Sequence, residues 1–307
     1  MNGLKSLNPA VVFFYFTAVN VIAMFNINPV TALISFAGSV ILWIVRDGRK
    51  DKRIHLLSVA VILGCAVINP LFSHNGKTAV MVINNNPVTL EAFVFGLTTG
   101  VIAASVFYWF STFSDVMTSD KIIYTVGKAS PKAALILTMS LRFIPLFIDR
   151  SKKINNAQKA MGIYRDETVI SRFRGIARVF SAMVTYAVEN MIITAESMEA
   201  RGYTGSKRRP YSLFGFIPRD FAVLSVSAVL SAFIIFLQAS GRIDFWFYPE
   251  ITGLRAGPAA LAGYCLYSAL SLIPSVIEGG DRIRWRFLKS RISASHTPAR
   301  MINTKKS

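Results

Sequence analysis

Long apolar runs separated by short polar segments dominate the pattern along this chain. A helix needs about 20 predominantly apolar residues to cross the hydrocarbon core of a bilayer, and six runs approach that length. Between the first two runs, the polar cluster Asn26 to Pro29 favours a turn and places a proline where a new helix can start. The pattern therefore predicts an all-α, polytopic helical membrane protein with about six transmembrane helices, at residues 10–26, 29–45, 54–72, 90–113, 220–240 and 257–278.

A further apolar run, residues 131–149, does not fit this count. Arg142 lies in its middle, where a charge costs about 2.5–3.5 kcal/mol at the bilayer centre. Pro131 suits the first turn of a helix, whereas Pro145 is expected to kink or break the helix. We therefore expect a helix that lies at the cytoplasmic interface or packs against the other helices, rather than a span.

The next apolar pattern predicts an amphipathic helix over about 170–200. Its acidic residues Glu189, Glu196 and Glu199 lie on a different face from a nearly apolar stripe. The stripe has two interpretations: ordinary helix packing, or a sliding contact with moving partners, which the flexibility of methionine permits. Its members, three or four residues apart, are Phe180, Met183, Ala187, Met191, Thr194 and Met198.

Composition agrees with a membrane protein, and the position of the charge adds a topology. The chain is 53% hydrophobic and 16% charged, whereas a soluble domain usually has about 25% charged residues. The net charge of +18 resides in three stretches, with five bases in 46–53, thirteen in 150–220 and eight in 282–307. Because Lys and Arg are retained on the cytoplasmic side, we expect a multi-pass protein of the cell inner (plasma) membrane with both termini in the cytoplasm.

The same pattern divides the chain into four parts. We expect transmembrane helices 1–4 in 1–113, a cytoplasmic or interfacial domain in 114–219, transmembrane helices 5 and 6 in 220–280, and a basic cytoplasmic tail in 281–307. The start is expected to be a retained first span, because its apolar run continues well beyond a signal-peptide core. The bilayer is the expected surrounding, and no nucleic-acid partner is expected, since the charge lies between spans rather than on a soluble surface.

No set of residues indicates catalysis. The segment Gly127–Ala129 resembles the end of a nucleotide-binding loop, but it lacks the hydroxyl residue after lysine and has Ile122 where the first glycine should stand. Cys65 and Cys265 lie in apolar runs and fit small packing residues better than a disulfide or a metal site. We therefore predict no catalytic residues, no cofactor and no metal site.

The most informative stretch is Ala195–Tyr203, at the end of the amphipathic helix. Gly202 suits a left-handed helix end, and Arg201 in the last turn has its cation near the negative end of the helix dipole. A strongly basic turn, Ser206–Tyr211, follows. Taken alone, the stretch fits a well-capped helix as readily as a functional motif.

Five segments of the chain, taken in order, resemble the sequence motifs of a known family. They are Asn69–His74 (NPLFSH), Ser119–Lys121 (SDK), Leu141–Pro145 (LRFIP), Ala157–Gly162 (AQKAMG) and Met198–Tyr203 (MEARGY). With these segments the chain resembles the transmembrane T component of energy-coupling factor transporters, the group that includes the cobalt-transport permeases. The likeness covers most of residues 60–210, and the ordered set is far more specific than any one tripeptide.

The resemblance implies two docking motifs. In that family two coupling helices each end in Ala-Arg-Gly, and each motif docks a groove on one of two ATP-hydrolysing subunits. The second motif matches in full at Ala200, Arg201 and Gly202, whereas the first has methionine in place of arginine, at Ala160, Met161 and Gly162. Arg142, Gln158, Lys159 and Glu199 are expected to support the docking, with Lys159 or Arg165 able to supply charge beside Met161.

By resemblance, the chain is expected to be the energy-coupling subunit of an ATP-driven importer of a vitamin or a transition-metal ion, without enzymatic activity of its own. Its expected partners are two ABC-type ATPase subunits, which hydrolyse ATP, and a membrane-embedded substrate-binding subunit. Because the first motif has Met161 at the position where the second motif has Arg201, we expect the two ATPase contacts to be unequal.

Two alternatives from other classes remain at this stage. A self-sufficient secondary transporter usually has repeats or ionisable residues near the bilayer midplane, whereas Glu91 and Glu278 lie near the ends of their spans. A membrane enzyme acting on lipids would show metal-dependent turnover by the isolated protein. Proton-coupled flux in vesicles containing only this chain would favour the transporter.

Overall fold

The computed structural model describes residues 3–46, 52–73, 76–83, 86–162, 169–203, 214–243, 245–248 and 257–294. The chain forms two compact units. Unit 1 combines Met1–Thr118 with Phe214–Ser307, and unit 2 is Ser119–Leu213. Each unit is described by itself.

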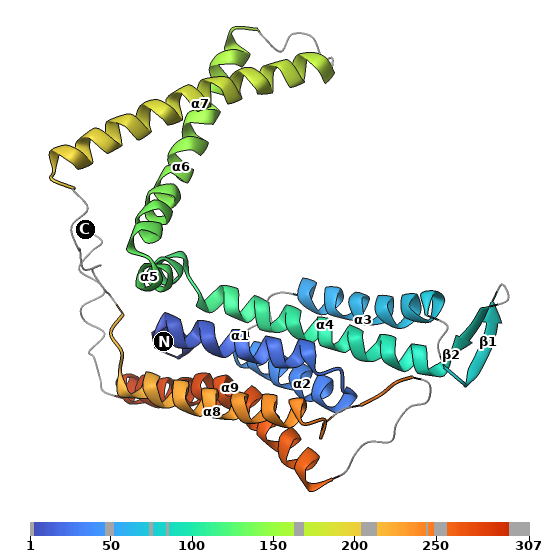
Figure 1. Cartoon of the computed structure of the whole chain (residues 1–307). Helices are drawn as coiled ribbons and strands as arrows, with labels where there is room; N and C mark the ends of the chain where they lie inside the picture. The colour runs from blue at the N-terminus through green and yellow to red at the C-terminus, as the bar shows by residue number, and fades with distance from the viewer. Residues whose placement is uncertain are drawn as a thin grey trace. The chain divides into compact units, whose positions relative to one another are not determined.

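The described residues of unit 1 form a bundle of six α-helices with a short β-hairpin (Figure 1). Asparagine side chains open the first two helices: the Asn8 and Asn28 side-chain oxygens accept hydrogen bonds from the Ala10 and Val30 amides. A proline follows each cap in the first helical turn. The elements are a 3-10 turn at Leu4–Ser6, α1 (Pro9–Phe25), α2 (Pro29–Val45), α3 (Lys52–Phe72), β1 (Ala79–Ile83), β2 (Asn86–Thr89), α4 (Leu90–Val116), α8 (Pro218–Ala239) and α9 (Pro258–Ala294).

Helix α4 lies at the centre of this unit and packs against α1, α2 and α3. Its Trp109 is fully buried, with its ring 5.9 Å from that of Phe16 in an edge-to-face arrangement. The Trp109 indole N–H donates a 3.2 Å hydrogen bond to the Ser35 hydroxyl of α2, so the one polar atom of this side chain is satisfied. The core of unit 1 is therefore built around an aromatic side chain that ties three helices together.

Two glycines one helical turn apart let α3 approach α4 closely. A Cβ at Gly96 would lie 2.5 Å from the Cys65 carbonyl oxygen, and one at Gly100 would lie 2.9 Å from the Ile62 Cα. Small residues at this spacing are typical of helix pairs inside membranes, because they allow the two backbones to come together. Larger residues at either position would push the helices apart.

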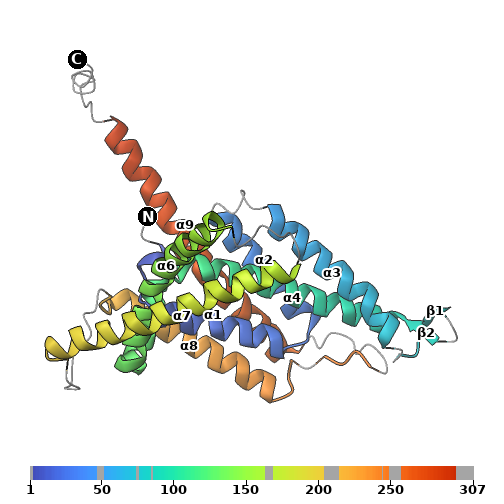
Figure 2. The same ribbon diagram turned by 90° about the horizontal axis from the view of Figure 1, so that it is seen from above.

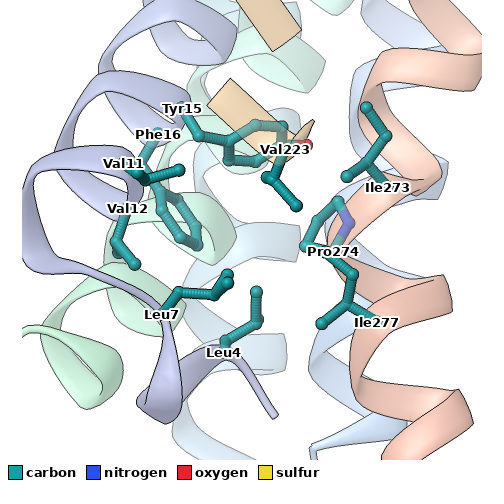
Figure 3. A pocket seen from close by; sticks show the side chains of 10 residues that line it. All are labelled: Leu4, Leu7, Val11, Val12, Tyr15, Phe16, Val223, Ile273, Pro274 and Ile277. Atoms are coloured by element: carbon teal, nitrogen blue, oxygen red, sulfur yellow. The ribbon is translucent and has the colours of Figure 1, made fainter. Parts of the chain in front are cut away.

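The segment before α1 also belongs to the core. Figure 3 shows Leu4 and Leu7 between side chains of α1 and the α9 residues Ile273 and Ile277. Both leucines are buried. The Leu4 amide donates a 3.0 Å hydrogen bond to the Glu278 carboxylate, which fixes this segment to α9.

Unit 2 consists of α5 (Ser119–Ala129) and two long helices, α6 (Pro131–Ala160) and α7 (Val169–Ala200). The Ser130 hydroxyl caps α6 by accepting from the Ala133 amide, and Pro131 stands in its first turn, as predicted. Of the two outcomes expected at Pro145, a kink or a break, the structure excludes the break, because α6 continues through Pro145 to Ala160. A proline removes one intrahelical hydrogen bond, and the fifteen helical residues after it retain theirs.

The predicted spans correspond to α1, α2, α3, α4, α8 and α9, which confirms the all-α membrane fold. Among the described residues, however, the six helices that are long and apolar enough to cross a membrane are α3, α4, α6, α7, α8 and α9, whereas α1 and α2 are shorter apolar helices. The number agrees with the prediction, but the set differs at α6 and α7. The segment between α3 and α4 contains the β1–β2 hairpin, with Ile83 opposite Asn86.

Candidate functional site

The α7 end has the geometry of a Schellman motif. Gly202 has φ of 70°, in the left-handed region, as the sequence predicted. Its amide donates to the Glu199 carbonyl at 2.8 Å, and the Tyr203 amide donates to the Met198 carbonyl at 2.9 Å. These two bonds reverse the chain directly after Arg201, which leaves that residue at the tip of the helix.

The α6 end repeats this geometry as far as the structure describes it. Gly162 has φ of 75°, and its amide donates to the Lys159 carbonyl at 3.0 Å. The Met161 amide donates to the Ala157 carbonyl at 3.0 Å. The two predicted docking motifs thus occupy equivalent places, each at the point where a long helix ends in a left-handed glycine.

The side chains at the two tips are open to solvent but differ in chemistry. Met161 is 69% exposed, and Arg201 is also exposed. Among the described residues no carboxylate lies within 4.0 Å of the Arg201 guanidinium. One tip therefore presents a charge with up to five N–H donors, and the other presents a flexible apolar chain.

The expected supporting residues do not form one group. Lys159 and Glu199 are exposed beside the two tips, whereas Gln158 is buried. Arg142 is exposed in the middle of α6, about five helical turns from Met161 by residue spacing. Arg165 and the basic turn Ser206–Tyr211 lie outside the described residues.

A contact between α6 and α7 joins the two long helices. The Phe147 ring of α6 lies 6.1 Å from the Tyr186 ring of α7, edge to face. The Arg150 guanidinium lies 4.9 Å from the centre of the same tyrosine ring, within the range of a cation–π contact. We call these three residues the α6–α7 joint. The sequence contained no signal for it, since a contact between two helices depends on where they cross.

An open groove of about 410 Å³ lies beside the α6–α7 joint. One wall is polar, with Ser151, Lys152 and Asn155 from α6. The other wall includes Phe180 and Met183, the first members of the predicted α7 stripe. The stripe is only partly covered, since Phe180 is 70% exposed and Met191 is 56% exposed. Ordinary packing within unit 2 therefore accounts for only part of it.

Metal-binding chemistry has no visible basis in the part of the chain that the structure describes. There, no group of three or more His, Cys, Asp or Glu side chains is arranged to hold an ion. Cys65 is half-buried and Cys265 is exposed, and both are free thiols.

Comparison with known proteins places these features in a family. The sequence model of the family described as "Cobalt transport protein" (CbiQ) matches residues 2–212. The chain is 30% identical over 111 residues to the energy-coupling factor transporter transmembrane protein EcfT of Streptococcus equi, covering 36% of this chain and 41% of that protein. It is 37% identical over 99 residues to EcfT of Streptococcus thermophilus, covering 32% and 37%. The EcfT of Bacillus subtilis is 33% identical over 108 residues, covering 34% and 41%. The chain thus spans about two fifths of the length of these relatives.

Proposed function

The chain belongs to the cobalt transport protein (CbiQ) family, and we propose that this multi-pass membrane protein is the energy-coupling subunit of an ATP-driven importer. The observation that carries the proposal is the pair of equivalent tips on α6 and α7, each ending in a left-handed glycine with an exposed side chain beside it. The names of the EcfT relatives, which describe an energy-coupling factor transporter, support it. The solute is proposed to be a vitamin or a transition-metal ion.

The partners follow from the chemistry of the tips. Two ABC-type ATPase subunits would dock in the cytoplasm, one at Ala200–Gly202 and one at Ala160–Gly162. An arginine fork can form paired, charge-assisted hydrogen bonds with a carboxylate, and Arg201 offers such a fork in this reading. A membrane-embedded substrate-binding subunit would complete the complex and capture the solute, so the chain itself needs no catalytic residue and no cofactor.

Long helices can carry motion from the ATPases into the membrane. At 1.5 Å per residue, α6 and α7 measure about 45 Å and 48 Å, respectively. The α6–α7 joint lies within both helices, so a displacement of either tip is passed to the other helix through Tyr186. ATP-driven closing of the ATPases would thereby reorient the substrate-binding subunit and release the solute inward.

The topology belongs to the same proposal. All three basic stretches lie in the cytoplasm, with both termini inside and with α1, α2, α3, α4, α8 and α9 as the six spans. Arg142 argues against α6 as a span, since an exposed charge in mid-helix is costly in lipid. Helices α6 and α7 then lie at the cytoplasmic interface, where the ATPases can reach both tips.

The hydrogen bonds of two carboxylates disfavour the secondary-transporter alternative. Glu91 accepts a 3.2 Å hydrogen bond from the Thr78 amide, and Glu278 accepts one from the Leu4 amide. Both groups hold backbone, Glu91 in the first turn of α4 and Glu278 within α9, which is a structural use rather than a place in an ion pathway. No observation favours the third candidate, an enzyme acting on lipids.

Co-purification tests the proposal directly. The chain is expressed with candidate ATPase subunits, extracted in mild detergent, and compared with Arg201→Glu. Arg178→Glu is the matched control, since it reverses an exposed charge on the same helix away from the tip. We expect ATPase chains to be retained by the wild type and by Arg178→Glu and lost from Arg201→Glu. Failure of the wild type to retain any ATPase would contradict the proposal.

A further inference from the structure

The carboxyl-terminal part of α9 lies outside the family match and is unused by the coupling mechanism. The family model ends at residue 212, whereas α9 runs from Pro258 to Ala294. Figure 2 shows the red end of α9 extending away from the other helices of unit 1. Its properties therefore need an explanation of their own.

The length of the uncharged part of α9 matches a bilayer. Residues 258–277 contain no charged side chain, and twenty helical residues measure about 30 Å, the thickness of the hydrocarbon core. Glu278 is the first charge along the helix. The following residues, up to Lys289, add about 18 Å, which is more than the headgroup layer requires. Residues 282–289 thus lie at or beyond the level of the headgroups.

This segment alternates bases with large apolar side chains. Among its members, Trp285 is 52% exposed and Phe287 is 68% exposed. Arg284, Arg286 and Lys289 are exposed as well. Tryptophan concentrates at membrane–water interfaces, and Arg and Lys beside it meet the phosphates of the headgroup layer. From Arg282 to the end of the chain there are eight bases and no acid.

The distribution of the bases around the helix sets its orientation. At about 100° per residue, Arg282, Arg286 and Lys289 lie on one side of the helix, and Arg284 lies on nearly the opposite side. A helix that lies flat on a membrane gathers its bases on one polar face. Bases on two opposite sides instead suit a helix that passes upright through the headgroup layer, because a helix lying flat would turn Arg284 into the apolar layer.

We propose that residues 282–289 form a collar that binds the headgroups of anionic phospholipids in the leaflet where α9 leaves the bilayer. The collar would set the depth of unit 1 in the membrane. Two contacts connect α9 with other elements of unit 1 and would fix their depth as well. Glu278 accepts a 3.0 Å hydrogen bond from the Leu4 amide, and Asp281 lies 3.9 Å from Arg219 at the start of α8. The proposal goes beyond the coupling function and does not depend on the ATPases.

Native mass spectrometry of the full chain alone, titrated with phosphatidylglycerol or with phosphatidylcholine of the same acyl chains, tests the collar. The helix triple variant carries Arg284→Gln, Arg286→Gln and Lys289→Gln. The tail triple variant, Arg300→Gln, Lys305→Gln and Lys306→Gln, removes the same charge from beyond the described residues. A charge-keeping variant, Arg284→Lys with Arg286→Lys, controls for the fold.

Each base near an anionic surface contributes about fivefold in binding, so the helix triple should lose roughly 100-fold in affinity for phosphatidylglycerol. The tail triple and the charge-keeping variant should keep the wild-type preference. Equal binding of the two lipids by the wild type, or equal loss in both triples, would overturn the collar. If the helix triple kept its lipid preference but lost ATPase chains on co-purification, the segment would be a protein contact instead, and the proposal would fail.

Discussion

Unit 1 and unit 2 bury their apolar residues very differently. Every fully buried apolar side chain that the structure describes belongs to unit 1, including Trp109, Leu42 and Leu270. In unit 2, large apolar side chains such as Phe173 and Ile136 are 74% and 65% exposed. A helix pair that is apolar yet uncovered must meet lipid or another protein. Unit 1 is therefore held together by its own core, whereas the helices of unit 2 expose apolar side chains suited to contacts with lipid or another protein.

A substitution in the core of unit 1 should cause the largest loss of stability. Trp109→Ala should lower the free energy of unfolding by about 3–5 kcal/mol, because it removes a fully buried indole and leaves a cavity among α1, α2 and α4. Denaturant unfolding of the purified chain in detergent measures it. Phe173→Ala, in unit 2, should change the stability by less than about 0.5 kcal/mol. Similar losses in both variants would contradict the contrast between the units.

A smaller effect concerns the close approach of α3 and α4. Gly100→Leu should cost about 1–3 kcal/mol, since its side chain must displace the α3 backbone at Ile62. The labelling rate of Cys65 with a maleimide reports the opening, because that thiol lies beside Gly100 and is half-buried. Gly64→Leu, on the open face of α3, is the control. Unchanged labelling in Gly100→Leu would show that the pair does not depend on the glycines.

The smallest effect tests the α6–α7 joint. Tyr186→Ala should lower stability by only about 0.5–1 kcal/mol, because the cation–π contact with Arg150 is largely exposed. In reconstituted complexes it should nevertheless slow ATP-driven uptake several-fold while ATPase chains still co-purify. Tyr186→Phe keeps the ring and should behave as the wild type. Normal uptake by the alanine variant would mean that the joint does not transmit motion.

Much of unit 1 could be predicted from the sequence because its helices have strong local signals. The Asn28–Pro29 pair marks the start of α2, and the length of each apolar run fixes its helix to within a few residues, except where α9 continues to Ala294. The left-handed Gly202 was predicted from helix-end chemistry and is confirmed. Local patterns carry this information because caps and periodicity act within one turn.

Three features could not be predicted, each for a physical reason. The continuation of α6 past Pro145 depends on the balance between one lost hydrogen bond and the turns that follow it. The β1–β2 pairing depends on register, and strands of only five and four residues carry too little pattern to fix it. The α6–α7 joint depends on where the two helices cross, and an amphipathic pattern does not specify which residues of two helices will be in contact. The docking role of the two tips stays a prediction.

We expect the two tips to dock ATPase subunits unequally, and the dissociation constant of purified ATPase from the immobilised chain measures the difference. Removing one partner of a desolvated charge pair costs about 2–5 kcal/mol, so Arg201→Ala should weaken binding at least about 30-fold. Met161→Ala removes only an apolar contact and should weaken it less than about fivefold. Equal losses in the two variants would contradict the account.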